Sequence, residues 1–102
     1  MTMLTITVPA TVDLADLEQQ TVSALADRLR DDHGCELTDL RPHTSEWGNE
    51  YGLAPTGRIV VDNHQNKLTV RLHGLPVDAH DLFVAVSSEL EQQYDELSTE
   101  IG

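Results

Sequence analysis

The chain of 102 residues has little positive charge. It holds 6 Lys plus Arg against 18 Asp plus Glu, and Lys67 is its only lysine. The formal net charge of −12 at pH 7 disfavours direct binding to nucleic acids or anionic membranes, because these polyanions need Lys and Arg as counter-charges. We therefore expect neither a nucleic acid nor a membrane as the direct partner.

Cysteine and long apolar runs are also scarce. Cys35 is the single cysteine, which excludes a disulfide within the chain. Nowhere do 18 apolar residues stand together, and the stretch 1–8 has no basic leader followed by a long apolar run. We expect a protein of the reducing cytoplasm that is neither exported nor membrane-spanning.

The length fits a single domain, 1–102. Leu4, Ile6 and Val8 alternate with threonines, which predicts a half-buried strand that ends at Pro9. From Asp13 the period changes to that of a helix, which is capped by Asp13 or Thr11 and stops at 33–34, His-Gly. The apolar face of this helix comprises Leu14, Leu17, Thr21, Leu25 and Leu29, with Val22 beside them.

The middle of the chain predicts short strands. In 36–41, Leu37 and Leu40 cannot share one face of a regular pleat, so this strand lies at an edge or carries a bulge. The stretches 58–62 and 67–73 form the clearest hairpin, joined by 63–66, whose asparagines tolerate turn conformations.

The irregular stretch 42–57 contains Trp47 and Tyr51, two of only four aromatic residues. Within it, 46–51 fits a tight hairpin that turns at Gly48-Asn49. Trp and Tyr dominate binding hot spots, so this pair is a candidate contact anchor. The alternative, equally open, is a lid over the uncovered side of the sheet.

A long amphipathic helix is predicted in the stretch 76–101, with Pro76 and Asp78 at its start. Asp78 is its expected N-cap, with Asp81 near the positive end of the helix dipole. The apolar stripe comprises Ala79, Phe83, Val86, Leu90, Tyr94, Leu97 and Ile101.

The predicted order is β-α-β-β-β-α. It indicates an α+β two-layer sandwich, with a mainly antiparallel four-stranded sheet and both helices on one face. The helix, three strands and helix resemble the element order of double-stranded-RNA-binding domains. The start of the last helix, basic in that family, is acidic here at Asp78 and Asp81, so RNA binding is not carried over.

Residue patterns for catalysis or metal binding are weak. The five histidines form no His-x-His or His-x-x-x-His pair, although His73 and His80 are close enough in sequence to share a site with Asp78 or Asp81. Cys35 follows a helix C-terminus, where the dipole disfavours a thiolate. No serine elbow or phosphate-binding glycine loop is present. We expect no enzyme, no cofactor and no metal.

The acidic residues fall in rows on the predicted helices. Glu89, Glu96 and Glu100 share one flank of the second helix, with Glu91 and Asp95 on the other. Asp16, Asp27 and Asp31 form a similar row on the first helix. The stretch 78–100 would rise about 33 Å and carry seven acids, about one per 5 Å. Duplex DNA presents about one charge per 1.7 Å, so imitation of DNA would need both helices.

These patterns favour a small non-catalytic module that binds a larger basic protein, such as nucleic-acid machinery, as an inhibitor or regulator. Nucleic-acid mimicry, as used by phage or mobile-element inhibitors of restriction or CRISPR effectors, is one form of this hypothesis. The expected contact residues are Trp47, Tyr51, Asp16, Asp27, Asp31, Glu89, Glu96 and Glu100. One alternative is a salt-adapted structural or regulatory domain, without mimicry, that contacts partners through a sheet edge or as a homodimer. A lesser alternative is a small enzyme that uses His73, His80 and Asp81.

Overall fold

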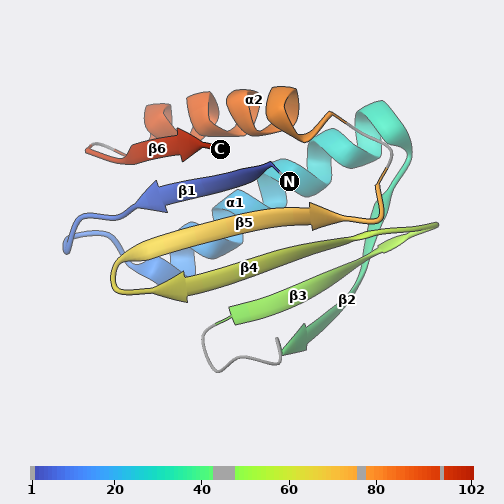
Figure 1. Ribbon diagram of the computed structural model, residues 1–102, viewed down its shortest axis with the longest axis horizontal. Helices are drawn as coiled ribbons and strands as arrows, with labels where there is room; N and C mark the ends of the chain where they lie inside the picture. Colours follow the sequence, from blue (N-terminus) through green and yellow to red (C-terminus); the bar gives the residue numbers. More distant parts are fainter. Residues whose placement is uncertain (1, 43–47, 76–77, 95) are drawn as a thin grey trace.

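The computed structural model describes residues 2–42, 48–75, 78–94 and 96–102. It has the α+β architecture expected from the sequence (Figure 1). The elements, in chain order, are β1 (Met3–Thr7), α1 (Leu14–His33), β2 (Glu36–Pro42), β3 (Gly48–Ala54), β4 (Arg58–His64), β5 (Lys67–His73), α2 (Ala79–Gln93) and β6 (Ser98–Ile101).

The strands form one antiparallel sheet in the order β2-β3-β4-β5-β1-β6. Both helices cover the same face of this sheet, as predicted: α1 crosses behind the central strands, and α2 runs along β1 and β6 (Figure 1). The helices also pack against each other. The molecule is therefore a two-layer sandwich, and the opposite face of the sheet carries no helix in the described residues.

A single core lies between the two layers. Alternate strand positions point toward the helices and are fully buried, among them Leu4 and Ile6 on β1 and Leu68 and Val70 on β5. They meet a helix side that includes Phe83, one of the largest fully buried side chains. This period-two burial is the pattern that the sequence predicted for the first strand and for the 67–73 strand.

Helix α1 begins and ends where the sequence predicts. The Asp13 carboxylate accepts a hydrogen bond from the backbone N–H of Ala15 at 3.1 Å. Gly34 terminates the helix in the left-handed conformation, with φ of 68°. No helix in the described residues is both long enough and apolar enough to cross a membrane.

Strand β2 and the β4–β5 hairpin also follow the sequence. Strand β2 is an edge strand, and its register with β3 shifts between Leu37 and Asp39, so both alternatives for this segment, edge and bulge, are confirmed. The hairpin turns at Gln65 and Asn66, whose φ values of 50° and 63° match a two-residue turn.

The prediction of four strands is wrong, because β3 and β6 add two. The expected turn at Gly48-Asn49 is instead the start of β3, which pairs with β2 on one side and β4 on the other. Two glycines in this strand, Gly48 and Gly52, lower its intrinsic propensity and hid it in the sequence. With four strands between the helices, the element order of double-stranded-RNA-binding domains is not preserved.

The prediction of a second helix that extends to residue 101 is also wrong. Helix α2 ends at Gln93, Glu96 adopts a positive φ of 68°, and the chain returns as β6 beside β1. Leu97 and Ile101 are four apart, which fits a helix, but their separation is equally a multiple of two. They pack against the core at the same alternating positions as a strand would present.

Candidate partner-binding surface

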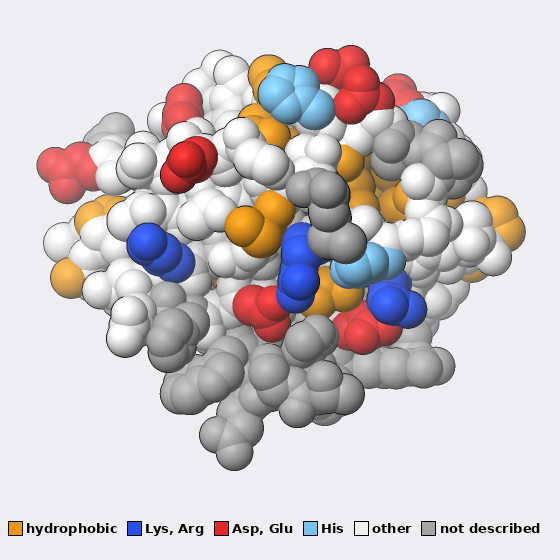
Figure 2. Space-filling model, in the orientation of Figure 1, with side chains coloured by type: hydrophobic (Ala, Val, Ile, Leu, Met, Phe, Trp, Pro, Cys, Tyr) orange, Lys and Arg blue, Asp and Glu red, His pale blue; other side chains and the backbone are white. Residues whose placement is uncertain are grey.

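The charges of the chain are divided between its two layers. The segments 13–34 and 78–94, which hold the helices with their caps, contain ten of the 18 acidic residues but only two of the six basic ones. The remaining four basic residues belong to the strands. Figure 2 looks at the sheet face opposite the helices and shows Lys and Arg side chains spread across it, with Asp and Glu side chains beside them.

Two arginines of the sheet are matched by acids. Arg71 contacts Asp62 at 2.7 Å, and Arg58 contacts Glu50 at 3.3 Å, each between adjacent strands. These pairs neutralise part of the charge of the sheet, whereas the helical layer keeps a large excess of acid.

Two of the predicted contact residues join the helices to each other. Glu89 on α2 contacts Arg28 on α1 at 3.3 Å, and both side chains are about two-fifths exposed. Asp16 accepts a 2.9 Å hydrogen bond from the hydroxyl of Tyr94. Burial, and then this bond, raises the pKa of Tyr94. These contacts bridge the two helical segments, which pack side by side and present one acidic surface across both.

The other predicted residues are dispersed. Asp27 and Asp31 both contact Arg30, each at 3.4 Å, on the exposed face of α1. Glu96 lies in the turn after α2, and Glu100 lies on β6, so the predicted row Glu89–Glu96–Glu100 does not exist. The row is absent because α2 ends at Gln93, before Glu96 and Glu100. Trp47 lies outside the described residues, as does Asp95, which the sequence assigned to the opposite flank.

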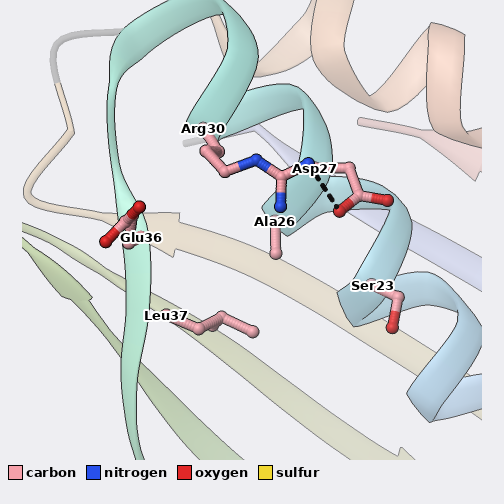
Figure 3. A pocket seen from close by; sticks show the side chains of 6 residues that line it. All are labelled: Ser23, Ala26, Asp27, Arg30, Glu36 and Leu37. Atoms are coloured by element: carbon pink, nitrogen blue, oxygen red, sulfur yellow. Dashed lines mark ion pairs between the residues drawn. The ribbon is translucent and has the colours of Figure 1, made fainter.

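A groove runs between α1 and the edge strand β2. It consists of two cavities, of about 310 and 430 Å³, that share Ser23 and Leu37. The first is lined by Ser23, Ala26, Asp27, Arg30, Glu36 and Leu37 (Figure 3), and the second by Gln19, Gln20, Val22, Ser23, Leu37 and Tyr51. We call this feature the α1–β2 groove. Each half lies at the lower end of the range of ligand pockets, about 300–1,000 Å³.

Small side chains on the helix keep the groove open. Ser23 and Ala26 are three residues apart, on the side of α1 that faces β2, and neither is large enough to reach the strand. In Figure 3, Leu37 extends from β2 toward the helix below Ala26. The Leu37 side chain is 43% exposed, one of the few large apolar side chains so exposed in the described residues.

Tyr51 lines the groove, and a hydrogen bond to α1 holds its side chain in place. Its hydroxyl donates a 2.6 Å hydrogen bond to Glu18 on α1. The same carboxylate accepts from the side-chain amides of Asn49 at 2.8 Å and Asn63 at 3.5 Å. Burial first, and the bond to Glu18 second, raise the pKa of Tyr51 well above its ordinary value. The sequence-based prediction of Tyr51 as a contact residue therefore falls on a groove wall.

Glu18 itself was missed by the sequence analysis. Only 6% of its surface is exposed, although it stands in a chain full of solvated acids. Its position next to Leu17 and three before Thr21, both fully buried, was the available signal. The side chains that donate hydrogen bonds to its carboxylate belong to β3 and β4. The periodicity of the helix sequence does not show which strands lie opposite Glu18.

A third cavity, of about 280 Å³, lies between the end of α1 and the start of α2. Its lining is Arg28, Asp32, His33, Asp78, Asp81, Leu82 and Ala85. Within residues 2–42, 48–75, 78–94 and 96–102, no group of three His, Cys, Asp or Glu side chains is arranged to hold a metal ion. His73 ends β5, and His80 is exposed in the first turn of α2.

Comparisons of the chain with protein-family models, with curated proteins and with solved structures found no match.

Proposed function

We propose that this protein is a non-catalytic binding module that engages a larger, positively charged protein through its helical layer. The observation that carries the proposal is the division of charge: the helices and their caps hold ten of the 18 acids, while Glu50 and Asp62 on the sheet are paired with arginines. A one-sided field of this kind attracts a basic surface and orients it on approach.

The density of charge defines the mode of action. Helix α1, with 20 residues, is about 30 Å long, and the helices with their caps carry eight more acidic than basic residues. This amounts to about one net charge per 4 Å, less than half the density of duplex DNA at about one per 1.7 Å. The layer thus competes for a basic cleft by its total charge and does not reproduce the spacing of phosphates.

The partner class follows from this field. Proteins that process nucleic acids present extended basic clefts, and a compact acidic domain occupies such a cleft as an inhibitor or regulator. Restriction and CRISPR effectors, as targets of phage or mobile-element inhibitors, belong to this class. We assign the protein to the reducing cytoplasm, where its buried free Cys35 stays reduced.

A binding series in salt tests the proposal. The dissociation constants for a panel of basic nucleic-acid-binding proteins are measured from about 0.1 to about 1 M NaCl, over which the screening length falls from about 10 to about 3 Å. We expect binding at the low end that weakens steeply with salt, and competition with DNA for the same cleft. Absence of binding throughout the panel at low salt, or affinities indifferent to salt, would overturn the proposal.

A second candidate function is a salt-adapted structural or regulatory domain. It is favoured by the third cavity, which is lined by Asp32, Asp78 and Asp81, with Arg28 as the only arginine or lysine among the lining residues. Such like charges repel in dilute buffer and are screened in concentrated salt. Thermal melting separates the two candidates: a salt-adapted domain unfolds in dilute buffer and folds in molar salt, whereas a module for ordinary cytoplasm is folded in both.

A further inference from the structure

The α1–β2 groove lies along a strand whose outer edge is free. Strand β2, seven residues long, ends the sheet, and no strand in the described residues pairs with its outer side. An edge strand presents unpaired N–H and C=O groups that a second chain can join. The other edge, β6, has four residues and is held to α2 by a 2.8 Å hydrogen bond from Thr99 to Glu91.

We propose that the α1–β2 groove binds an extended basic segment of the partner protein, which joins the sheet as an added strand beside β2. This inference rests on the proposed function and names the contact through which the basic partner is held. Backbone hydrogen bonds to β2 supply affinity for any extended chain, and the groove supplies selection of side chains.

The groove selects apolar side chains at alternate positions. Successive residues of a strand point to opposite faces, so every second side chain of the added segment points toward α1. There it meets Leu37, which is 43% exposed, and the space left by Ser23 and Ala26. Burial of this apolar surface on binding contributes favourable free energy that is absent while the groove is open to water.

The charges at the groove favour a basic segment. Asp27 and Glu36 line it, and the single cation there, Arg30, already contacts Asp27 and Asp31. The lysines or arginines of the added segment alternate with the side chains that face α1, so they are attracted by the field of these carboxylates over several ångströms, and an acidic segment is repelled. A second copy of this chain is disfavoured for the same reason, because each copy carries a net charge of −12.

The probe is a synthetic peptide of alternating lysine and valine, blocked at both ends, added to the full chain labelled with ¹⁵N. We expect amide chemical-shift changes concentrated in β2 and in the Ser23–Arg30 part of α1. A matched peptide with N-methyl groups on the amides that would face β2 keeps its charge and side chains but loses the donors. It is expected to bind at least about tenfold more weakly, as the loss of about 1.4 kcal/mol implies.

Two pairs of variants test the groove itself. Ser23→Leu fills the space between α1 and β2, while Ser88→Leu makes the same change at an exposed position of α2. Leu37→Asp removes the apolar contact, while Val84→Asp makes a matched change at a side chain that is 48% exposed on α2. The groove variants are expected to weaken the peptide about tenfold or more, and the α2 variants less than about twofold.

Several outcomes would overturn the inference. They are shifts spread over the whole acidic layer, equal binding of the N-methylated peptide, equal effects of Ser23→Leu and Ser88→Leu, or self-association through β2. Salt-sensitive binding of a basic protein that survives Ser23→Leu would leave the proposed function standing and remove the groove. If the peptide binds in the groove but no basic protein binds at low salt, the groove would stand and the proposed function would fall.

Discussion

The hydroxyl of Tyr51 on β3 donates a 2.6 Å hydrogen bond to the carboxylate of Glu18 on α1, across 33 positions of sequence. The bond ties the helix to the sheet beside the α1–β2 groove. Because Glu18 is almost fully buried and is satisfied by neutral donors, its contribution to stability differs in kind from that of the solvated acids around it.

Replacement of Glu18 is expected to be costly. Glu18→Ala leaves the hydroxyl of Tyr51 and the amide of Asn49 without their acceptor, which predicts a loss of about 2–4 kcal/mol in the free energy of unfolding. Glu89→Ala, at a half-exposed glutamate on α2, is the control and should cost less than about 1 kcal/mol. Urea denaturation measures both. Equal losses in the two variants would show that the buried hydrogen bonds of Glu18 stabilise the protein no more than an exposed glutamate does.

The pH dependence of stability follows from the tyrosines. Tyr51 has a raised pKa in the folded protein because of burial and its bond to Glu18. The folded chain therefore retains a proton that the unfolded chain loses above pH about 10. Stability from this group is intact below that pH and falls as pH rises above it. In Tyr94→Phe, ultraviolet absorbance should show Tyr51 ionising only well above pH 10, and an ordinary titration there would contradict the account.

The ion pair between the helices should matter little for stability. Arg28 and Glu89 are 38% and 41% exposed, so water screens their attraction. Glu89→Gln is expected to change the free energy of unfolding by about 0.5 kcal/mol or less, and less still in molar salt. A double-mutant cycle with Arg28→Gln isolates the pair. A coupling energy of several kcal/mol would mean that this contact, and not the shared core, holds the helices together.

The turn before β6 offers a test of where α2 ends. Glu96 has a φ of 68°, a conformation that glycine adopts without a side-chain penalty. Glu96→Gly should leave stability unchanged or raise it by up to about 1 kcal/mol. Glu91→Gly, within the helix, should lower it by about 1–2 kcal/mol, because the helix loses propensity and the hydroxyl of Thr99 loses its acceptor. Thermal melts of the two variants decide the matter, since a helix that continued through Glu96 would be destabilised by both changes.

Local signals in the sequence were sufficient for much of this fold. The cap at Asp13, the left-handed stop at Gly34 and the bulge between Leu37 and Asp39 depend on neighbouring residues only, and each was predicted. So was the placement of both helices on one face. Strand β3 and strand β6 were missed, because each is stabilised by pairing with strands distant in sequence, β4 and β1.

The candidate surface was predicted less completely. Periodicity identified Asp27, and composition identified Tyr51, both of which line the groove. The sequence did not reveal the groove, because the space beside Ser23 and Ala26 exists only when an edge strand lies opposite them (Figure 3). Nor could it reveal that Glu89 faces Arg28 on the other helix. These are properties of how elements meet and not of any one element.

The central claim, that the helical layer attracts the partner, is tested most directly by matched charge reversals on the two layers. Asp32→Lys lies in the last turn of α1, where a cation suits the helix dipole, and Glu100→Lys lies on β6. The association rate constant of each variant with a basic nucleic-acid-binding protein is measured at low salt. We expect a clear fall in the rate constant for Asp32→Lys and a much smaller one for Glu100→Lys. Equal rates for the two variants, or a larger effect at Glu100, would contradict the claim.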